Sequence, residues 1–404
     1  MNTVADQRPD LLSKFASIAS ARAELSSNGI DPTAVVIDEM RSATLGISQG
    51  RELLLAGTNN YLGLTFHPDC IAAGQRALAQ LGTGTTGSRM ANGNYAIHQR
   101  LEQALARFYD LPYAMVFATG YGANLGVLNA LLGPEDCVLL DADAHASLYD
   151  GCKLAGARVY RFKHNDPDSL EKRLRRLGDD AGRCLIVVEG LYSILGDRAP
   201  LPEFVALKER YGAYLMVDEA HSLGIYGSHG RGVCEADAMT KRIDFIVGTF
   251  SKTLGATGGY CVSHLPIAEL MRYASRPYIF TASPCPSVTA TVLAALEVIA
   301  GTSEYKDRLW HNARRLYEGL AQLGFRLGPE LSPVVAVRGE TREQVLHAWQ
   351  RLLAAGVYVN LIVPPASPDG SSLLRLSVSA AHTDAQIDTL LATIAAQCQP
   401  LLPK

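Results

Sequence analysis

A lysine flanked by hydroxyl side chains is the first candidate for chemistry in this sequence. Lys252 lies in the run TFSKTLG, which begins at Thr249, the last residue of the apolar segment 245–249. A lysine that loses its water at the end of a strand has a lowered pKa and can form a Schiff base. Thr249 and Ser251 carry hydroxyl groups that suit phosphate oxygens. An ordinary exposed lysine stays open as the alternative for Lys252 taken alone.

A carboxylate and an imidazole come at the end of another apolar segment, at 214–218. Asp218 is the last residue of this segment, and His221 follows three residues later in the run DEAH. A carboxylate that loses its water is destabilised unless it meets a cation, so Asp218 indicates a protonated ring nitrogen or a metal nearby. The alternative is a capping aspartate with a surface histidine.

A glycine-rich turn offers backbone groups to an anion. Gly120 and Tyr121 follow the apolar segment 114–118 and open a helical stretch. Free N–H groups and the helix dipole at such a start attract phosphate, although a plain strand-to-helix turn has the same pattern.

Together, the polar groups at these segment ends predict one cofactor site. His145 follows the segment 138–141, where it can lie against a bound ring or cap a helix, and Glu189 and Ser193 come at the end of the next strand but one. Pyridoxal phosphate needs a protein that holds its phosphate, keeps its pyridine nitrogen protonated and binds it as an imine. The lysine, the aspartate, the histidines and the glycine turn supply these parts, so the sequence predicts a pyridoxal-phosphate enzyme.

A sheet must position these residues, because each of them follows a short apolar segment. From about residue 100 such segments alternate with helix-periodic stretches, which is typical of βαβ units and a largely parallel sheet. Strands are expected at 114–118, 138–141, 158–162, 184–189, 214–218, 245–249 and 260–263, and helices at 124–132, 147–155, 169–177 and 203–211. The pattern predicts a doubly wound α/β domain, in which ligands bind beyond the carboxyl ends of the strands.

The chain changes character near residue 300. After it come strands expected at 333–337, 357–362 and 373–379 and helices expected at 303–323, 343–354 and 384–395. We therefore expect a large cofactor-binding domain at 61–300 and a smaller α+β domain at 301–404. The segment 1–60 is expected to pack with the small domain, and its helix-like stretch at 11–25 to form a packing helix or a dimer arm.

Composition and charge exclude several classes of protein. The 404 residues are 48% hydrophobic and 19% charged, which rules out disorder and a disulfide scaffold. With 37 basic and 40 acidic side chains, nothing favours nucleic-acid or membrane-surface binding. The eight cysteines are scattered singly, so they are expected to be reduced core thiols that bind no metal. With no signal peptide or integral membrane segment expected, the protein is predicted to be cytoplasmic.

One glycine pattern mimics a nucleotide-binding fingerprint. The run GTGTTG at 82–87 matches GxGxxG, but residues 71–81 before it favour a helix, and the dinucleotide fingerprint requires a strand there. The P-loop pattern GxxxxGK[ST] does not occur. NAD and P-loop nucleotides are therefore not expected.

Several runs of the sequence resemble the α-oxoamine synthases. They are GTNNYLGL (57–64), GTGTTGSRMAN (82–92), DADAHASLYDG (141–151), VDEAHSLG (217–224), GTFSKTLG (248–255) and LLRLSVSAAHT (373–383). Members of that family are pyridoxal-phosphate enzymes of fold type I, like aspartate aminotransferase, and they condense an amino acid with an acyl thioester and release CO₂. The resemblance covers nearly the whole chain and implies an acyltransferase with a large, mainly parallel seven-stranded sheet.

The resemblance also implies a role for each site residue. Lys252 would carry pyridoxal 5'-phosphate as an imine, and Asp218 would pair with the pyridine nitrogen. His221 would bind the phenolic oxygen, and His145 would stack on the ring. Further cofactor contacts would come from Gly120, Tyr121, Ser193, Thr249 and Ser251, and from Thr281 and Ser283 of a neighbouring subunit. The substrate carboxylate would be bound by Arg375, with Asn60 and Tyr61 completing the site across a homodimer interface.

The substrates are implied by the spelling of other runs. The runs RFKHND (161–166), RPYIFTAS (276–283) and YVNLIVPPASP (358–368) are most similar to family members that use L-serine and a long-chain acyl thioester, on CoA or acyl carrier protein. Pro284-Cys285 and Ala366 depart from the usual family pattern, which leaves acyl specificity open. Other branches of the family stay open as alternatives, as do an aminotransferase and a non-catalytic partner subunit.

Overall fold

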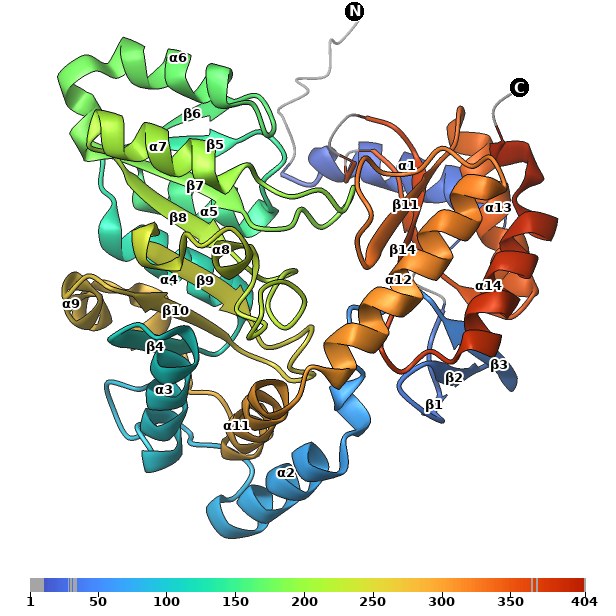
Figure 1. Cartoon of the computed structure of the whole chain (residues 1–404), viewed down its shortest axis with the longest axis horizontal. Coiled ribbons are helices and arrows are strands. Elements are labelled where there is room, and N and C mark those ends of the chain that lie inside the picture. Colours follow the sequence, from blue (N-terminus) through green and yellow to red (C-terminus); the bar gives the residue numbers. More distant parts are fainter. Residues whose placement is uncertain are drawn as a thin grey trace, which may run out of the picture.

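A seven-stranded sheet forms the centre of the large part of the molecule (Figure 1). The computed structural model describes residues 11–27, 29, 31, 35–364, 366–367 and 370–402. In chain order the strands of this sheet are β4 (Tyr113–Phe117), β5 (Cys137–Asp141), β6 (Arg158–Phe162), β7 (Cys184–Glu189), β8 (Tyr214–Asp218), β9 (Phe245–Thr249) and β10 (Gly259–Ser263). All seven expected strands are confirmed.

This sheet is parallel except for one strand. The spatial order is β4-β10-β9-β8-β7-β5-β6, and only β10 runs antiparallel to its neighbours. The register places Glu189 of β7 opposite Asp218 of β8, and Asp218 opposite Val247 of β9. The carboxyl ends of three neighbouring strands therefore meet at one edge, where a doubly wound fold binds its ligands.

Helices cover both faces of the large sheet. Successive side chains of β7 point to opposite faces, so that Leu185 and Val187 pack in one apolar cluster and Ile186 and Val188 in another. The first cluster includes α4 (Gly120–Leu131), α5 (Ala146–Ala155), α9 (Ile267–Ala274) and α10 (Arg276–Ile279). The second includes α2 (Pro68–Leu81), α3 (Ala96–Tyr109), α6 (Pro167–Leu177), α7 (Leu201–Tyr211), α8 (Val233–Ala236) and α11 (Pro286–Gly301). Burial on both faces explains why a central strand such as β7 is a nearly continuous apolar run.

The C-terminal part combines three helices with a small antiparallel sheet. Its strands pair in the order β11 (Val334–Arg338), β14 (Leu373–Ser377) and β13 (Asn360–Ile362). Its helices are α12 (Glu304–Gln322), α13 (Arg342–Ala354) and α14 (Asp384–Gln397). Thr341 and Thr383 form capping boxes with Gln344 and Gln386, which fixes where α13 and α14 begin.

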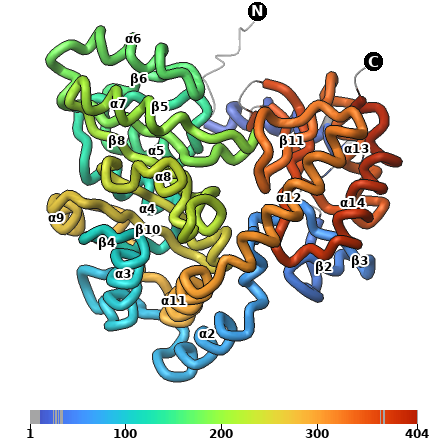
Figure 2. Tube along the Cα trace, viewed as in Figure 1, coloured from blue at the N-terminus to red at the C-terminus, as the bar shows by residue number. Residues whose placement is uncertain are grey.

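The N-terminal strands join the C-terminal part. The strands β1 (Glu39–Met40), β2 (Leu45–Ser48) and β3 (Arg51–Leu55) are antiparallel, and β12 (Val357–Tyr358) pairs with β3 in parallel. In Figures 1 and 2 the blue N-terminal strands accordingly lie on the same side as the orange and red C-terminal elements. The division of the chain at residues 60 and 300 stays a prediction.

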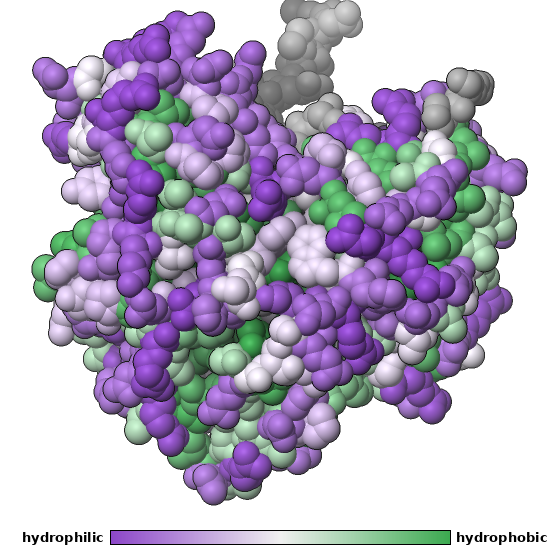
Figure 3. Space-filling model, in the orientation of Figure 1, coloured by the Kyte–Doolittle hydropathy of each residue, from purple (hydrophilic) through white to green (hydrophobic). Residues whose placement is uncertain are grey.

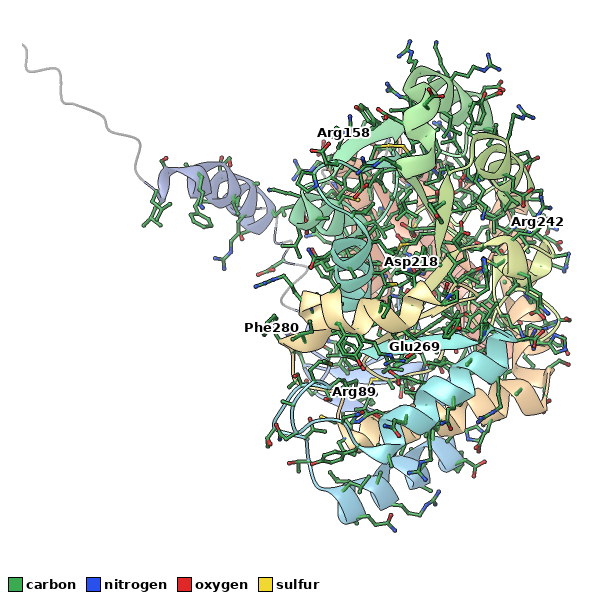
Figure 4. The ribbon with its side chains drawn as sticks, turned by 90° about the vertical axis from the view of Figure 1, so that its left-hand side faces the viewer. Arg89, Arg158, Asp218, Arg242, Glu269 and Phe280 are labelled. Carbon is green, nitrogen blue, oxygen red and sulfur yellow. A yellow bond between two sulfur atoms is a disulfide. The ribbon has the colours of Figure 1, made fainter. Side chains whose placement is uncertain are left out.

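The N-terminal helix and the surface complete the picture. The helix expected at 11–25 forms as α1 (Ala16–Ser27), which stands away from the large part in Figure 4. Hydrophilic side chains predominate on the face seen in Figure 3, with hydrophobic ones between them. In the run 358–368, Pro365 and Pro368 lie outside the described residues.

The cysteines differ from the expectation at one place. Six of them are free thiols, and all but Cys285 of these are buried. Cys137 and Cys184, however, are joined in a disulfide, so the expectation of eight reduced thiols is wrong for this pair. The two residues stand opposite each other in the register of β5 and β7, with Cα atoms 4.7 Å apart, a separation that a disulfide can bridge.

The most apolar helix belongs to the core. This helix is α11, whose Val292, Leu296 and Ile299 are buried. Over the described part of the chain, no helix by itself has both the length and the apolar composition to cross a membrane. The helices α11 and α12 reach that length only as a pair, across a 79° bend.

Candidate active site

A cavity of about 350 Å³ lies at the carboxyl-end edge of the large sheet. Its walls come from the ends of β7, β8 and β9 and from the starts of α4 and α5. Asp218, at the end of β8, lies within the body of the large part in Figure 4. The cavity brings together the predicted cofactor residues Gly120, Tyr121, His145, Asp218, His221, Thr249, Ser251 and Lys252.

One side of the cavity combines a helix start with two hydroxyl groups. Thr119 caps α4 by accepting a hydrogen bond from Gly122 N at 2.8 Å, and Thr249 Oγ1 lies 2.9 Å from Ser251 Oγ. A Cβ atom on Gly120 would lie 2.6 Å from Thr249 Cβ, so this close approach of helix and strand requires glycine. Free N–H groups, the helix dipole and hydroxyls together make a site for an anion such as phosphate.

Asp218 is buried and held by two hydrogen bonds. Its Oδ1 accepts from Ala220 N at 2.9 Å, and its Oδ2 accepts from Asn124 Nδ2 at 2.8 Å. Asn124 Nδ2 also donates to Ser147 Oγ at 2.9 Å. These neutral donors orient the carboxylate, and no cation of the described chain forms an ion pair with it. This favours a protonated ring nitrogen as its partner.

Lys252 is poised as a nucleophile. Burial lowers its pKa to about 8, although the carboxylates of Asp218 and Glu189 act in the opposite direction. Within the described chain its amine lines the cavity without a hydrogen bond or an ion pair of its own. A neutral amine in this place can bond to an aldehyde carbon, and the sequence-based prediction for Lys252 rested on this chemistry.

His145 borders the cavity as a neutral ring. Burial lowers its pKa and the Lys252 ammonium acts in the same direction, while the Asp218 carboxylate opposes them. The backbone N–H of His145 donates to Glu189 Oε1 at 2.6 Å, and its Nδ1 lies 2.7 Å from Ser147 Oγ. His145 is also the cap of α5. The capping interpretation is therefore confirmed, and the place of His145 against a bound ring stays a prediction.

A hydrogen-bond chain connects the cavity to the small sheet. Tyr61 OH lies 2.7 Å from His221 Nδ1 and accepts from Arg375 Nη2 at 3.2 Å. Burial, with help from the Lys252 and Arg375 cations, lowers the pKa of His221 well below its usual value. A neutral His221 that accepts at Nδ1 carries its proton on Nε2, where it can donate a hydrogen bond to a ligand.

Arg375 is a buried cation that lacks a carboxylate partner. It lies in the middle of β14 and is only 4% exposed. Its Nε donates to Ser193 O at 2.9 Å and its Nη1 to Asn59 Oδ1 at 2.7 Å, and no described aspartate or glutamate pairs with it. Because a buried charge requires an opposite charge, this site favours a ligand with a carboxylate.

Two residues expected on the substrate side, Tyr61 and Asn60, differ in their contacts with Arg375. Tyr61 reaches His221 and Arg375 within its own chain. That Tyr61 and Asn60 complete the site across a subunit interface stays a prediction. Asn60 turns away from Arg375, and its Nδ2 donates to Thr65 Oγ1 at 2.7 Å. The neighbouring Asn59 contacts Arg375 in its place.

Three further predicted residues lie outside the cavity walls. Ser193 approaches the site through its backbone carbonyl, which binds Arg375. Ser283 is buried in its own chain, where its Oγ donates to Gly93 O at 2.7 Å, whereas Thr281 is exposed next to Phe280, seen at the edge of the molecule in Figure 4. The prediction that Thr281 and Ser283 contribute to a neighbouring subunit's site stays a prediction.

Asn59, Asn124 and Ser147 are site residues that the sequence analysis did not identify. Asn124 lies one helical turn after Gly120 and thus on the same face of α4, a spacing that could have indicated it. Ser147 follows His145 at the start of α5. No signal separates Asn59 from Asn60, because adjacent asparagines in a loop have no periodicity that tells which one points inward.

The donor set fits pyridoxal phosphate. The anion site suits its phosphate, Asp218 its ring nitrogen, His221 its phenolic oxygen and Lys252 its aldehyde. In addition, Asn124 Oδ1 is buried and has no hydrogen-bond partner within the described chain, which leaves room for a donor on a ligand.

Comparisons with known proteins identify the family. The model of the aminotransferase class I and II family matches residues 51–394. The chain belongs to this family. Two relatives named serine palmitoyltransferase are 53% identical (Caulobacter vibrioides, 95% of each chain) and 50% identical (Sphingomonas paucimobilis, 95% of this chain and 91% of the relative). They confirm the membership among the α-oxoamine synthases that the sequence runs indicated.

Solved structures agree with this family. A serine palmitoyltransferase variant from S. paucimobilis with a bound PLP–myriocin aldimine superposes with a TM-score of 0.95 at 49% identity, over 97% of this chain and 99% of that one. Serine palmitoyltransferase from Sphingomonas wittichii gives 0.94 at 47% identity, over 98% and 100%. These matches show that the fold is fold type I and that the cofactor is pyridoxal 5'-phosphate.

A further relative by sequence belongs to another branch of the family. It is a putative 8-amino-7-oxononanoate synthase from Desulforudis audaxviator, 44% identical over 86% of this chain and 90% of its own.

Proposed function

We propose that the protein is a serine palmitoyltransferase, which condenses L-serine with palmitoyl-CoA to give 3-oxosphinganine, CoA and CO₂, the first step of sphingolipid biosynthesis. The observation that carries the proposal is the buried Arg375 beside the Lys252 cavity, which pairs with no carboxylate of the described residues. It defines an amino acid as the substrate class. Relatives at 50% and 53% identity that are named serine palmitoyltransferase support serine and the palmitoyl donor.

Each side chain of the cavity has a place in cofactor binding. When bound, pyridoxal phosphate supplies an electron sink for negative charge at the Cα atom of the amino acid. Asp218 would keep the ring nitrogen protonated, and His221 would donate from Nε2 to the phenolic oxygen. The phosphate would be held by the N–H groups of Gly120 and Tyr121 and by the hydroxyls of Thr249 and Ser251, and Lys252 Nζ would bond to the aldehyde carbon.

Arg375 orients the amino acid. Its guanidinium can bind a carboxylate with two parallel hydrogen bonds, which a lysine could not do. Asn59, Tyr61 and the Ser193 carbonyl fix the rotamer of Arg375 before the substrate arrives. A fixed carboxylate limits the rotation of the bound serine, and this selects which bond at Cα is broken.

Lys252 moves the proton. Its amine would be released when the amino group of serine takes its place at the aldehyde carbon. With a pKa of about 8, the released amine is partly neutral near pH 7 and could accept the Cα proton. The neutral His145 beside it neither competes for that proton nor adds a second positive charge. A bond from Cα to the acyl carbon would then form as the carbon–sulfur bond breaks and CoA leaves as its thiolate. The bond from Cα to the carboxylate would break to release CO₂, and the Lys252 ammonium could return a proton to Cα.

The active form is proposed to be a cytoplasmic homodimer. Thr281 is exposed, on the segment that the family resemblance places at the neighbouring subunit's cofactor. The acyl donor is proposed to be a long-chain thioester on CoA, with acyl carrier protein as the alternative carrier.

An acyl-transfer assay tests the function. Purified protein loaded with pyridoxal phosphate receives L-serine, glycine or L-alanine with acyl-CoAs of different lengths, and the release of free thiol is measured. We expect turnover with serine and palmitoyl-CoA and none in Lys252→Ala.

Other outcomes of this assay contradict the proposal. A preference for glycine would indicate 2-amino-3-ketobutyrate CoA ligase, and a preference for alanine with a shorter acyl group would indicate 8-amino-7-oxononanoate synthase, the name given to the relative at 44% identity. Amino transfer to 2-oxoglutarate without a thioester would indicate an aminotransferase.

A further inference from the structure

A histidine outside the cavity bridges two carboxylates. His164, in the loop after β6, lies with its Nδ1 2.9 Å from Asp141 Oδ1 and its Nε2 2.7 Å from Asp197 Oδ2. Ionised carboxylate oxygens only accept hydrogen bonds, so both ring nitrogens must donate, and the ring is an imidazolium. Nothing in the proposed chemistry uses this charge.

The surroundings of His164 keep it charged. Burial alone would lower its pKa, but the hydrogen bonds to Asp141 and Asp197 outweigh burial and raise the pKa to about 10. Asp143 Oδ2 adds a third negative group 3.8 Å from Nδ1. The Tyr192 ring packs edge-on against the imidazole, with ring centroids 4.3 Å apart. Near neutral pH the bridge is therefore a fixed ionic connection.

The bridge connects three neighbouring strand ends. Asp141 ends β5, His164 follows β6, and Asp197 lies in the loop that follows β7. That loop is folded back on itself, since Tyr192 N donates to Asp197 O at 2.9 Å. Asn165, next to His164, also donates to Asp197 Oδ2, at 2.9 Å. The far end of the loop is thus anchored to the sheet edge.

The same loop contacts the proposed substrate site. Between its two anchored ends lies Ser193, whose carbonyl accepts from Arg375 Nε at 2.9 Å. At its start, Glu189 Oε1 accepts from His145 N at 2.6 Å. Among the described residues of the large part, Ser193 supplies the only backbone group that hydrogen-bonds the Arg375 side chain. A shift of this loop would move that group.

We propose that His164 is a positioning residue for the amino-acid carboxylate. Its bridge between Asp141 and Asp197 holds the loop so that the Ser193 carbonyl orients Arg375. The inference rests on the proposed role of Arg375. It adds to the site a residue that touches neither the cofactor nor the substrate.

The test separates amino-acid binding from the other steps. His164→Asn is neutral and too short to bridge both carboxylates. In the pyridoxal-phosphate enzyme, L-serine binding is titrated by the absorbance of the bound cofactor, and the KM for palmitoyl-CoA is measured separately. We expect serine to bind about tenfold more weakly, with cofactor content unchanged and the palmitoyl-CoA KM within about twofold. The matched control is His311→Asn, because His311 pairs with Asp384 at 3.1 Å on the exposed surface of the small part; it should bind serine like the wild type.

A double variant shows whether His164 acts through Arg375. If it does, adding His164→Asn to Arg375→Lys should weaken serine binding by no more than about twofold further, because neighbours in one network are not additive. The proposal would be overturned if the two losses of serine affinity multiplied in the double variant. It would also be overturned if His164→Asn bound serine unchanged, or if it lost binding of serine, acyl donor and cofactor equally. An enzyme that binds serine but does not condense it would refute the proposed function and leave this role standing, whereas one that binds no amino acid would overturn both.

Discussion

Replacing Gly120 with alanine tests the phosphate side of the cavity. The added Cβ would lie 2.6 Å from Thr249 Cβ and 2.7 Å from Thr249 Oγ1. Non-bonded carbon atoms prefer about 3.5–4.0 Å, so either the helix start or the strand end must move by about 1 Å. Both groups belong to the proposed phosphate site, and a displacement of either one therefore weakens cofactor binding.

The size of the effect follows from the overlap. Forcing an extra carbon into a packed site costs about 1–3 kcal/mol. The empty site can relax around the added carbon, and cofactor binding then restores the overlap. This free energy is therefore lost from binding, and pyridoxal phosphate should bind about 5- to 160-fold more weakly. Unfolding of the cofactor-free protein should change less than cofactor binding does.

A titration of the cofactor-free protein with pyridoxal phosphate measures this effect by absorbance. Gly301→Ala is the matched control, because a Cβ on Gly301, at the end of α11, meets no atom within 4 Å. If Gly120→Ala binds the cofactor as tightly as Gly301→Ala does, the helix start and Thr249 do not form the phosphate site.

Three further predictions follow from the charged groups. The rate at which cofactor-free protein takes up pyridoxal phosphate covalently should rise with pH around a midpoint of about 8, because only the neutral Lys252 amine reacts; a midpoint near 10.5 in stopped-flow absorbance would contradict the lowered pKa. Tyr61→Phe removes the hydroxyl between His221 and Arg375, and the unpaired groups should cost about 1–3 kcal/mol, seen as a serine KM raised about tenfold with cofactor binding retained. For His164, a pKa raised from 6.5 to about 10 means that its contribution to the free energy of unfolding is fully present below pH 6.5 and is lost as the pH rises through 10. The upper bound of this contribution is about 5 kcal/mol. The free energies of urea unfolding of the wild type and of His164→Gln should therefore converge as the pH rises from 6.5 to 10. A difference that stays constant over this range would disprove the charged bridge.

The sheet and its chemistry could be predicted because both depend on local sequence. A buried parallel strand such as β7 is a continuous apolar run, and it ends where polar groups such as Glu189 begin. The fold then collects these ends at one edge. That is why Asp218, Lys252 and His145 were found without knowledge of a single contact.

The contacts between distant segments could not be predicted in the same way. The disulfide between Cys137 and Cys184 depends on β5 and β7 being neighbours although β6 lies between them in the sequence. The pairing of β3 with β12 likewise has no local signal. The hydrogen bond between Arg375 and Tyr61 joins residues 314 positions apart, and no local pattern predicts it.

The hydrogen bond between Arg375 and Asn59 joins residues that are 316 positions apart. On a ribosome, the first of these residues emerges long before the second is synthesised. Asn59 and Tyr61 therefore lack their contacts with Arg375 of β14 until nearly the whole polypeptide has been made. In the same way, β3 lacks its pairing with β12. A nascent chain can assemble the large sheet and a cofactor cavity early, but it gains amino-acid recognition only after synthesis is almost complete, so an unfinished chain that has acquired its cofactor is not yet able to use serine.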